Sequence, residues 1–307
     1  MELEVRCSNR PPVSQNLALV SGYIVLQYSL QIEAIASVPA ASSSMLLLNE
    51  SVLLIAALAF AILQSKRLRE ASFWHATITP LASIIGSGFL IIAPLMAEVA
   101  GELAPVAMAG ILLIAYCIGS VIRHNIGYFA RHPARQESLT VQRLEHASGV
   151  ILSIAYIISI AFYLRLMSAF LLSAIDSADP LLETTLTTIV LMVIGGIGWR
   201  YGLLALERLE TLAVSVKLAI IAALLAGLIH HNIVEGFSFI GVKAGHLTRL
   251  DQLRMLAGML LVGQGFETSR YLASQYCADV RIASMKLAQL LSTAIYMLFI
   301  ILILPLI

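Results

Sequence analysis

The chain has 307 residues, of which 59% are hydrophobic and only 12% are charged, and its mean hydropathy is +0.91. Soluble domains carry about 25% charged residues, so this composition indicates a membrane protein. The 19 Lys and Arg residues nearly balance the 18 Asp and Glu residues, which excludes a nucleic-acid binder, because such a protein needs a basic excess. Cys7, Cys117 and Cys277 are far apart and form no CxxC pair, which excludes a disulfide framework and a thiolate metal site.

The long apolar runs predict transmembrane helices, because an outer-membrane barrel would need strands in which apolar and polar residues alternate. A helix crosses the hydrocarbon in about 20 residues. Stretches near this length, separated by charged residues, occur at 76–96, 104–122, 148–175, 182–199, 209–229, 253–269 and 287–307. An eighth stretch, 45–63, is interrupted by polar residues at 49–51, and the sequence leaves open whether it spans. The first 44 residues are left unassigned, with 23–31 expected to be a loose surface segment.

The basic residues predict which side of the membrane each loop faces. Sorting the loops onto alternating sides places twelve Lys and Arg residues on one side and five on the other, and the richer side is expected to face the cytoplasm. The twelve are Lys66, Arg67, Arg69, Arg123, Arg131, Arg135, Arg143, Arg200, Arg208, Arg270, Arg281 and Lys286. The protein is therefore predicted to be a multi-pass protein of the cell (inner) membrane.

Three ionisable residues lie inside predicted spans, namely Arg165, Lys217 and Glu267. Such groups are costly in the hydrocarbon unless they face a partner or a cavity, so each is a candidate for function. For Arg165 a structural ion pair or a side chain that reaches the interface is the favoured interpretation. Glu267 is expected to meet either Arg165 or a proton, and the sequence does not choose between them.

A Gly-x-Gly-Phe pattern occurs in the middle of two predicted spans, at 86–89 in the first and 263–266 in the sixth. The first and sixth spans run in opposite directions, because an odd number of crossings separates them. Each glycine weakens a helix by about 1 kcal/mol relative to alanine. Interrupted spans at matching positions of two halves indicate the binding site of a transporter. The alternative is that these glycines serve only close packing between helices.

An interrupted helix offers two kinds of binding group at the middle of the membrane. The amides that begin its second half suit a substrate carboxylate, and the carbonyls that end its first half suit a cation or an ammonium. No nucleotide fingerprint, HExxH motif or intramembrane pair of acids occurs, so we expect neither an enzyme nor an ATP-driven pump, and no metal or cofactor. Tyr156 and Tyr163 share one helical face and either pack in the core, which is favoured, or line the path beside the interruptions.

The run SIIGSGFLIIAP at 83–94 resembles the first-helix signature of the amino acid, polyamine and organocation (APC) transporter superfamily. Gly-Phe-Glu at 265–267 resembles that family's broken sixth helix. The resemblance implies an all-α leucine-transporter-type fold of two inverted five-helix repeats. It implies an N-terminal extension at 1–72 that holds the short candidate span, a first repeat at 73–235 and two helices of a second repeat at 236–307. The implied substrate-binding residues are Gly86, Ser87, Gly88, Phe89, Gly263, Gln264, Gly265 and Phe266.

The fifth span resembles the family's fifth helix, in which some proton-coupled members carry a lysine in place of a sodium ion. Lys217 is the matching residue, and it is either a proton-coupling group, with Glu267 as a second, or a fixed structural ammonium. Residues 275–281 depart from the family pattern, which has an acidic pair and Asn-Pro after the sixth helix.

The sequence predicts a secondary active transporter of amino acids or related amines, which works by alternating access and is coupled to protons. Its expected partners are a small-molecule substrate and the lipid bilayer, with no nucleic acid, and no oligomeric state is predicted. The chain is expected to be truncated after its seventh core helix, because it ends inside an apolar run. The alternative is a truncated or degenerate transporter homologue that transports nothing and acts as a scaffold or partner subunit.

Overall fold

The computed structural model describes residues 43–86, 88–132, 138–173, 179–201, 203–237, 244–245 and 247–307, with the side chains of 43–49, 69, 173 and 203–209 excluded. Segment 23–31 and Ser87 lie outside the described residues, which form helices and no strand. The α-helices are α2 (Ser43–Leu63), α3 (Lys66–Arg69), α4 (Ser72–Ile84), α5 (Gly88–Ala100), α6 (Ala104–Arg131), α8 (Leu139–Ser173), α9 (Pro180–Tyr201), α10 (Leu203–Glu235), α11 (Arg249–Met259) and α12 (Ala278–Ile303). The 3-10 helices are η1 (Gly101–Leu103), η2 (Leu260–Gly263), η3 (Phe266–Ser274) and η4 (Leu304–Leu306).

The predicted all-α polytopic architecture is confirmed. Five regions of the described chain are long and apolar enough to cross a membrane, and they contain α6, α8, α9, α10 and α12. The predicted first and sixth spans are each divided between two helices, α4 with α5 and α11 with η3. Residues 45–63, for which the sequence left open whether they span, lie within one helix, α2, of 21 residues.

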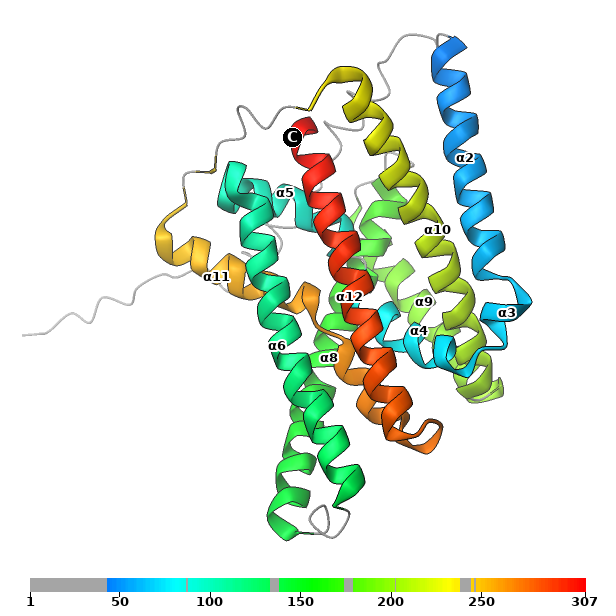
Figure 1. The fold of residues 1–307 in the computed structure, drawn as a ribbon, viewed down its shortest axis with the longest axis vertical. Helices are drawn as coiled ribbons and strands as arrows, with labels where there is room; N and C mark the ends of the chain where they lie inside the picture. The colour runs from blue at the N-terminus through cyan, green and yellow to red at the C-terminus, as the bar shows by residue number, and fades with distance from the viewer. Residues whose placement is uncertain are drawn as a thin grey trace, which may run out of the picture.

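The direction of the two divided spans is opposite, as the sequence predicts. Figure 1 shows the chain passing from α4 up to α5, whereas it descends from α11 into η3. The helices α6 and α12 lie side by side and also run in opposite directions (Figure 1). The additional helix α2 packs along α10, where the Val52 side chain lies 3.7 Å from the position that a Cβ atom would take at Gly227.

The buried core lies where the divided spans meet α6 and α12. Met96, Met108, Met285, Tyr296 and Phe266 are among its most deeply buried side chains. By contrast, α8 and α9 expose apolar side chains over most of their length. Helices that face lipid have no reason to hide such side chains, since the hydrocarbon is itself apolar. The protein therefore places its tightest packing around the interrupted helices.

Candidate functional site

The first divided span is interrupted at the glycines that the sequence singles out. The helix α4 ends at Ile84, and Ile85 leaves the helical conformation with φ −86° and ψ 71°. The helix α5 then begins at Gly88, and the Phe89 amide donates to the Gly86 carbonyl at 3.3 Å. The span is therefore interrupted between Ile84 and Gly88, and we call this interruption the first break.

The carbonyl end of α4 is satisfied by two side chains from other helices. Lys217 on α10 donates from Nζ to the Ile85 carbonyl at 2.6 Å. Tyr296 on α12 donates from Oη to the Ile84 carbonyl at 3.0 Å, and its side chain is completely buried. The last carbonyls of a helix have no donors within the helix, so these two contacts replace the missing ones.

The amide end of the first break is bordered by the ring of Tyr163. Gly88 is the first residue of α5, so its amide has no acceptor within that helix. A Cβ atom added at Gly88 would lie 3.6 Å from Val262 Cγ2 and 3.7 Å from Tyr163 Oη. One added at Gly86 would lie 3.6–3.8 Å from ring and hydroxyl atoms of Tyr163. The glycines therefore leave about one methyl group of space between the backbone and Tyr163.

The second break lies at residues 264–265, between η2 and η3. Gln264 is extended, and Gly265 has φ +111°, a conformation that favours glycine. A Cβ atom at Gly265 would lie 2.6 Å from the backbone carbon of Ser83 and 2.8 Å from the Ile84 amide nitrogen. Gly265 therefore lets the second break touch the end of α4, and the two predicted sites are brought together.

The amide of Gly265 is satisfied by an acidic side chain two residues later. It donates to Glu267 Oε2 at 2.8 Å, while the other carboxylate oxygen accepts from Tyr156 Oη of α8, also at 2.8 Å. The Thr268 hydroxyl donates to the Gly265 carbonyl at 2.7 Å. The second break thus uses its own carboxylate, with support from α8, to cap η3.

The intramembrane charges do not form the pair that the sequence left open. Arg165 Nε lies 3.8 Å from Glu183 Oε2, which links α8 to α9 on an exposed surface, in agreement with the favoured structural pairing. Glu267 contacts Tyr156 rather than Arg165. Lys217 contacts a backbone carbonyl at the first break. Two of the three intramembrane charges therefore lie at the breaks.

The remaining predicted residues divide between the breaks and the core. Phe89 is 4% exposed and packs against Phe299 and Tyr296, with ring centroids 4.4 and 5.5 Å apart, and Phe266 is 1% exposed. Both phenylalanines thus support the breaks from within the core. Tyr163 lies beside the first break, which is the less favoured of the two placements predicted for it.

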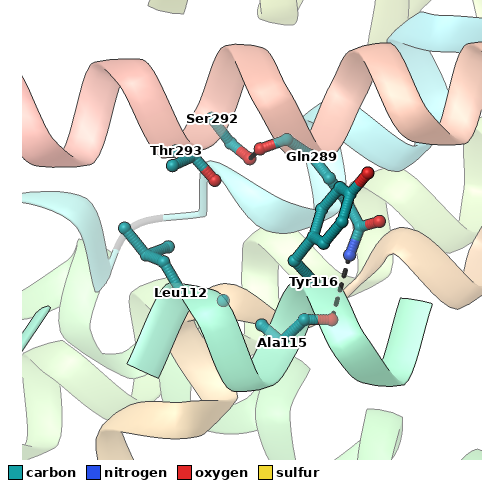
Figure 2. Close-up of a pocket in the computed structure, with 7 residues that line it drawn as sticks. Leu112, Ala115, Tyr116, Gln289, Ser292 and Thr293 are labelled. Atoms are coloured by element: carbon teal, nitrogen blue, oxygen red, sulfur yellow. Dashed lines mark hydrogen bonds between the residues drawn. The ribbon is translucent and has the colours of Figure 1, made fainter. Parts of the chain in front are cut away.

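A small cavity lies behind the second break, between α6 and α12, with room for about one water molecule. Figure 2 shows six of the seven residues that line it by name, and the lining is completed by Gly263. Gln289 Nε2 donates to the Ala115 carbonyl at 3.1 Å, and its Oε1 accepts from the buried Arg123, whose guanidinium lies 4.7 Å from the Tyr116 ring centre. This polar link joins α6 to α12 beside Gly263.

Sequence reasoning missed Tyr296 and Gln289, because both lie within the apolar run of α12 and their partners include backbone carbonyls. A buried tyrosine or glutamine in an otherwise apolar helix was the signal that could have singled them out. Among the described residues, no group of three His, Cys, Asp or Glu side chains is placed to hold a metal ion.

Comparison with known proteins identifies the family of this chain. A family model described as APC superfamily transporter matches residues 66–307, which include both breaks. An uncharacterized protein of Aquifex aeolicus (strain VF5) is 43% identical over 242 residues, covering 77% of this chain and 58% of that protein. The chain thus spans less than two thirds of the length of that relative. No solved structure matches this chain.

Proposed function

Because this chain belongs to a family of APC superfamily transporters, we propose that it is a secondary active transporter of amino acids or related amines. The observation that carries the proposal is the contact between the second break and the end of α4, directly before the first break. Gly265 lies against the backbone of Ser83 and Ile84, so the ends of two interrupted helices converge on one place within the membrane. Binding sites of this kind are typical of transporters with inverted repeats.

The contacts at the breaks support one orientation of the substrate. Lys217 and Tyr296 already satisfy the carbonyl end of α4, and Glu267 satisfies the Gly265 amide. We propose that the Gly88 amide, which has no acceptor within α5, and the Gly263 carbonyl at the end of η2 face the substrate. Amides that begin a helix favour a carboxylate, and carbonyls that end one favour an ammonium. A zwitterionic amino acid matches both ends.

Lys217 supports coupling to protons. Its part-buried ammonium donates to the Ile85 carbonyl, and a charge away from water that loses its hydrogen-bond partner is costly. If α4 moves during alternating access, this contact breaks, and release of the proton removes the cost. Glu267 is the second candidate, because a proton on its carboxylate would remove an acceptor from either Tyr156 or the Gly265 amide.

Uptake of labelled amino acids into proteoliposomes with an imposed pH gradient tests this function. We expect Gly88→Leu to abolish substrate binding while the protein still inserts, because the side chain fills the space between the break and Tyr163. Gly110→Leu is the matched control, since a Cβ atom there meets nothing within 4 Å. Absence of transport for every amino acid and amine offered to the full-length protein would overturn the proposal.

Coupling is tested separately with Lys217→Ala in the same proteoliposomes. We expect uptake down a substrate gradient to persist while the pH gradient no longer drives accumulation. Unchanged dependence on the pH gradient in this variant would make Lys217 a fixed structural ammonium, and the coupling role would then fail while transport stands.

A further inference from the structure

The helix α5 ends in carbonyls that need donors from elsewhere in the chain. It stops at Ala100, because Gly101 has φ +54°, a left-handed conformation that favours glycine and ends a helix. The last four carbonyls of an α-helix have no amide to accept from within that helix. In α5 these include the carbonyls of Glu98 and Val99. Both carbonyls therefore depend on contacts with another segment.

Both donors come from the start of the sixth span. The Gly245 amide donates to the Glu98 carbonyl at 2.7 Å. Gln252, in the first turn of α11, donates from Nε2 to the Val99 carbonyl at 3.2 Å. Gln252 is half-buried and Val99 is 4% exposed, so water competes little for this hydrogen bond. The end of α5 is thus fastened to the start of α11.

Gly245 allows the two segments to approach closely. A Cβ atom at this position would lie 3.1 Å from Glu98 Cγ and 3.3 Å from the Glu98 carbonyl oxygen. The Leu247 amide donates to the Gly245 carbonyl at 2.8 Å, and Thr248 then caps the start of α11. A short turn therefore leads from the contact with α5 directly into α11.

The other ends of the same two elements meet at the breaks. The helix α5 begins at Gly88, whereas α11 continues into η2, which ends at Gly263. A Cβ atom at Gly88 would lie 3.6 Å from Val262 Cγ2, so the elements are in contact at this end too. Both lie beside α6 (Figure 1). We call α5, α11 and η2 the α5–α11 pair, and it holds both groups that face the substrate in the proposed function.

The structure assigns Gln252 as a positioning residue for substrate binding, which acts with the Gly245 amide to fix the spacing between the Gly88 amide and the Gly263 carbonyl. This inference rests on the proposed function, in which these two groups face the substrate. A site whose groups are already in place binds more tightly than one that must be ordered on binding. Loss of the hydrogen bond from Gln252 frees the far end of the pair, so the two substrate groups are held less firmly.

Removal of the Gln252 amide tests this role in the proteoliposome uptake assay. We expect Gln252→Ala to raise KM about fivefold, the effect of one lost hydrogen bond, with kcat nearly unchanged. Gln252→Glu should raise KM at least as much, because it keeps the length of the side chain but a carboxylate has no hydrogen to donate. Arg254→Ala is the matched control and should keep the parent KM, because it breaks only the ion pair with Asp251 within α11.

A disulfide at the neighbouring contact distinguishes positioning from general damage. In a background without the three native cysteines, Glu98→Cys is combined with Gly245→Cys. The sulfur at 98 takes the place of Glu98 Cγ, which lies 3.1 Å from the Cβ position at 245, so a disulfide can form. In the oxidised protein, Gln252→Ala should have a KM near that of the same protein with Gln252 intact. Reduction of the disulfide should raise KM again.

Three results would overturn the inference while transport by the parent protein leaves the proposed function standing. The first is an unchanged KM in Gln252→Ala, and the second is a raised KM that the disulfide does not lower. The third is failure of the two cysteines to crosslink on oxidation, since the contact between Glu98 and Gly245 would then be absent. Absence of uptake by the parent protein for every amino acid and amine offered would remove the proposed function and this inference together.

Discussion

Each break leaves backbone groups without hydrogen-bond partners in their own helix, and side chains of opposite charge satisfy these groups at the two breaks. At the first break, carbonyls that have no donor within α4 accept from an ammonium and a phenol of distant helices, Lys217 and Tyr296. At the second, an exposed amide is satisfied by the carboxylate of Glu267, only two residues away in the chain. The first break is therefore held by tertiary contacts, and the second is held largely by local ones.

The two breaks also differ in why they contain glycine. One glycine is required by the backbone conformation, and the others leave space beside the backbone. Gly265 has a positive φ and lies against the backbone of α4, so the fold requires it. Gly86 and Gly88 have ordinary contact distances to Tyr163 at their Cβ positions, so the fold would accept a methyl group there. The first break consequently has glycines that the packing alone does not explain, which fits a site that must admit a ligand.

The strongest test of this comparison replaces one glycine in each break by alanine. Gly265→Ala forces a methyl group into the backbone of Ser83 and Ile84 and strains φ, at a cost on the order of 2–5 kcal/mol. We expect most of this variant to be lost from the monodisperse fraction in size-exclusion chromatography. Gly86→Ala should remain monodisperse but bind substrate more weakly. Equal yields of the two variants would show that the second break does not need its glycine.

The caps of α4 are compared by removing each donor. Tyr296→Phe leaves the buried Ile84 carbonyl without a partner, which costs about 1–3 kcal/mol and should lower the thermal unfolding temperature. Lys217→Met removes a donor and a buried charge together, so its stability loss should be smaller, while the response of uptake to the pH gradient disappears. Tyr201→Phe is the control, because that side chain is 70% exposed. A loss of gradient response in Tyr296→Phe as well would contradict the division of roles.

Prediction from the sequence succeeded where a feature depends on the chain itself. The interruptions between Ile84 and Gly88 and at 264–265 lie at the paired glycines, and the polytopic helices follow from the lengths of the apolar runs. The residues that contact the breaks were harder to predict from the sequence. Lys217 stands out as a charge in an apolar span, but its acceptor is a backbone carbonyl, which has no sequence signature.

Contacts between distant helices were missed for a geometric reason. The pairing of Glu145 with Arg270 and of Gln289 with Arg123 depends on which helical faces meet. A helix with little amphipathic asymmetry, such as α8 in a lipid environment, does not reveal its inward face by hydrophobicity. Burial in the structure identifies that face, and with it the polar residues that contact the second break.

A third prediction concerns the cavity behind the second break, between α6 and α12. A methyl group in Gly119→Ala would overlap the Gln289 amide and displace it from the Ala115 carbonyl and from Arg123. We expect a loss of about 1–2 kcal/mol in unfolding free energy. Gly127→Ala, whose nearest neighbour would lie 3.4 Å away, should change stability little.

A double-mutant cycle identifies the source of that loss. In a Gln289→Ala background the methyl group at Gly119 meets no amide, so Gly119→Ala should cost less there than in the parent protein. Additive losses in the two backgrounds would show that Gln289 does not explain the requirement for glycine at 119.

The smallest expected change in stability concerns the residues that precede α4 and α11, where the two divided spans begin. Thr248 caps α11 by accepting from the Asp251 amide at 3.2 Å, and its hydroxyl donates to the Asp251 carboxylate, which lowers the pKa of Asp251 below its usual value. Ala71 occupies the same position before α4 with an extended backbone and offers no side-chain cap. We expect Thr248→Ala to destabilise the protein at pH 7 by about 1 kcal/mol, or about 2 °C in Tm, and Ala71→Ser to stabilise it by about half as much. Thr248→Ser should keep the Tm of the parent protein, because serine retains the hydroxyl that caps α11. A lower Tm for Thr248→Ala and a higher Tm for Ala71→Ser would show that the start of α4 lacks a stabilising cap that α11 has. Shifts of the same sign in both variants would contradict this.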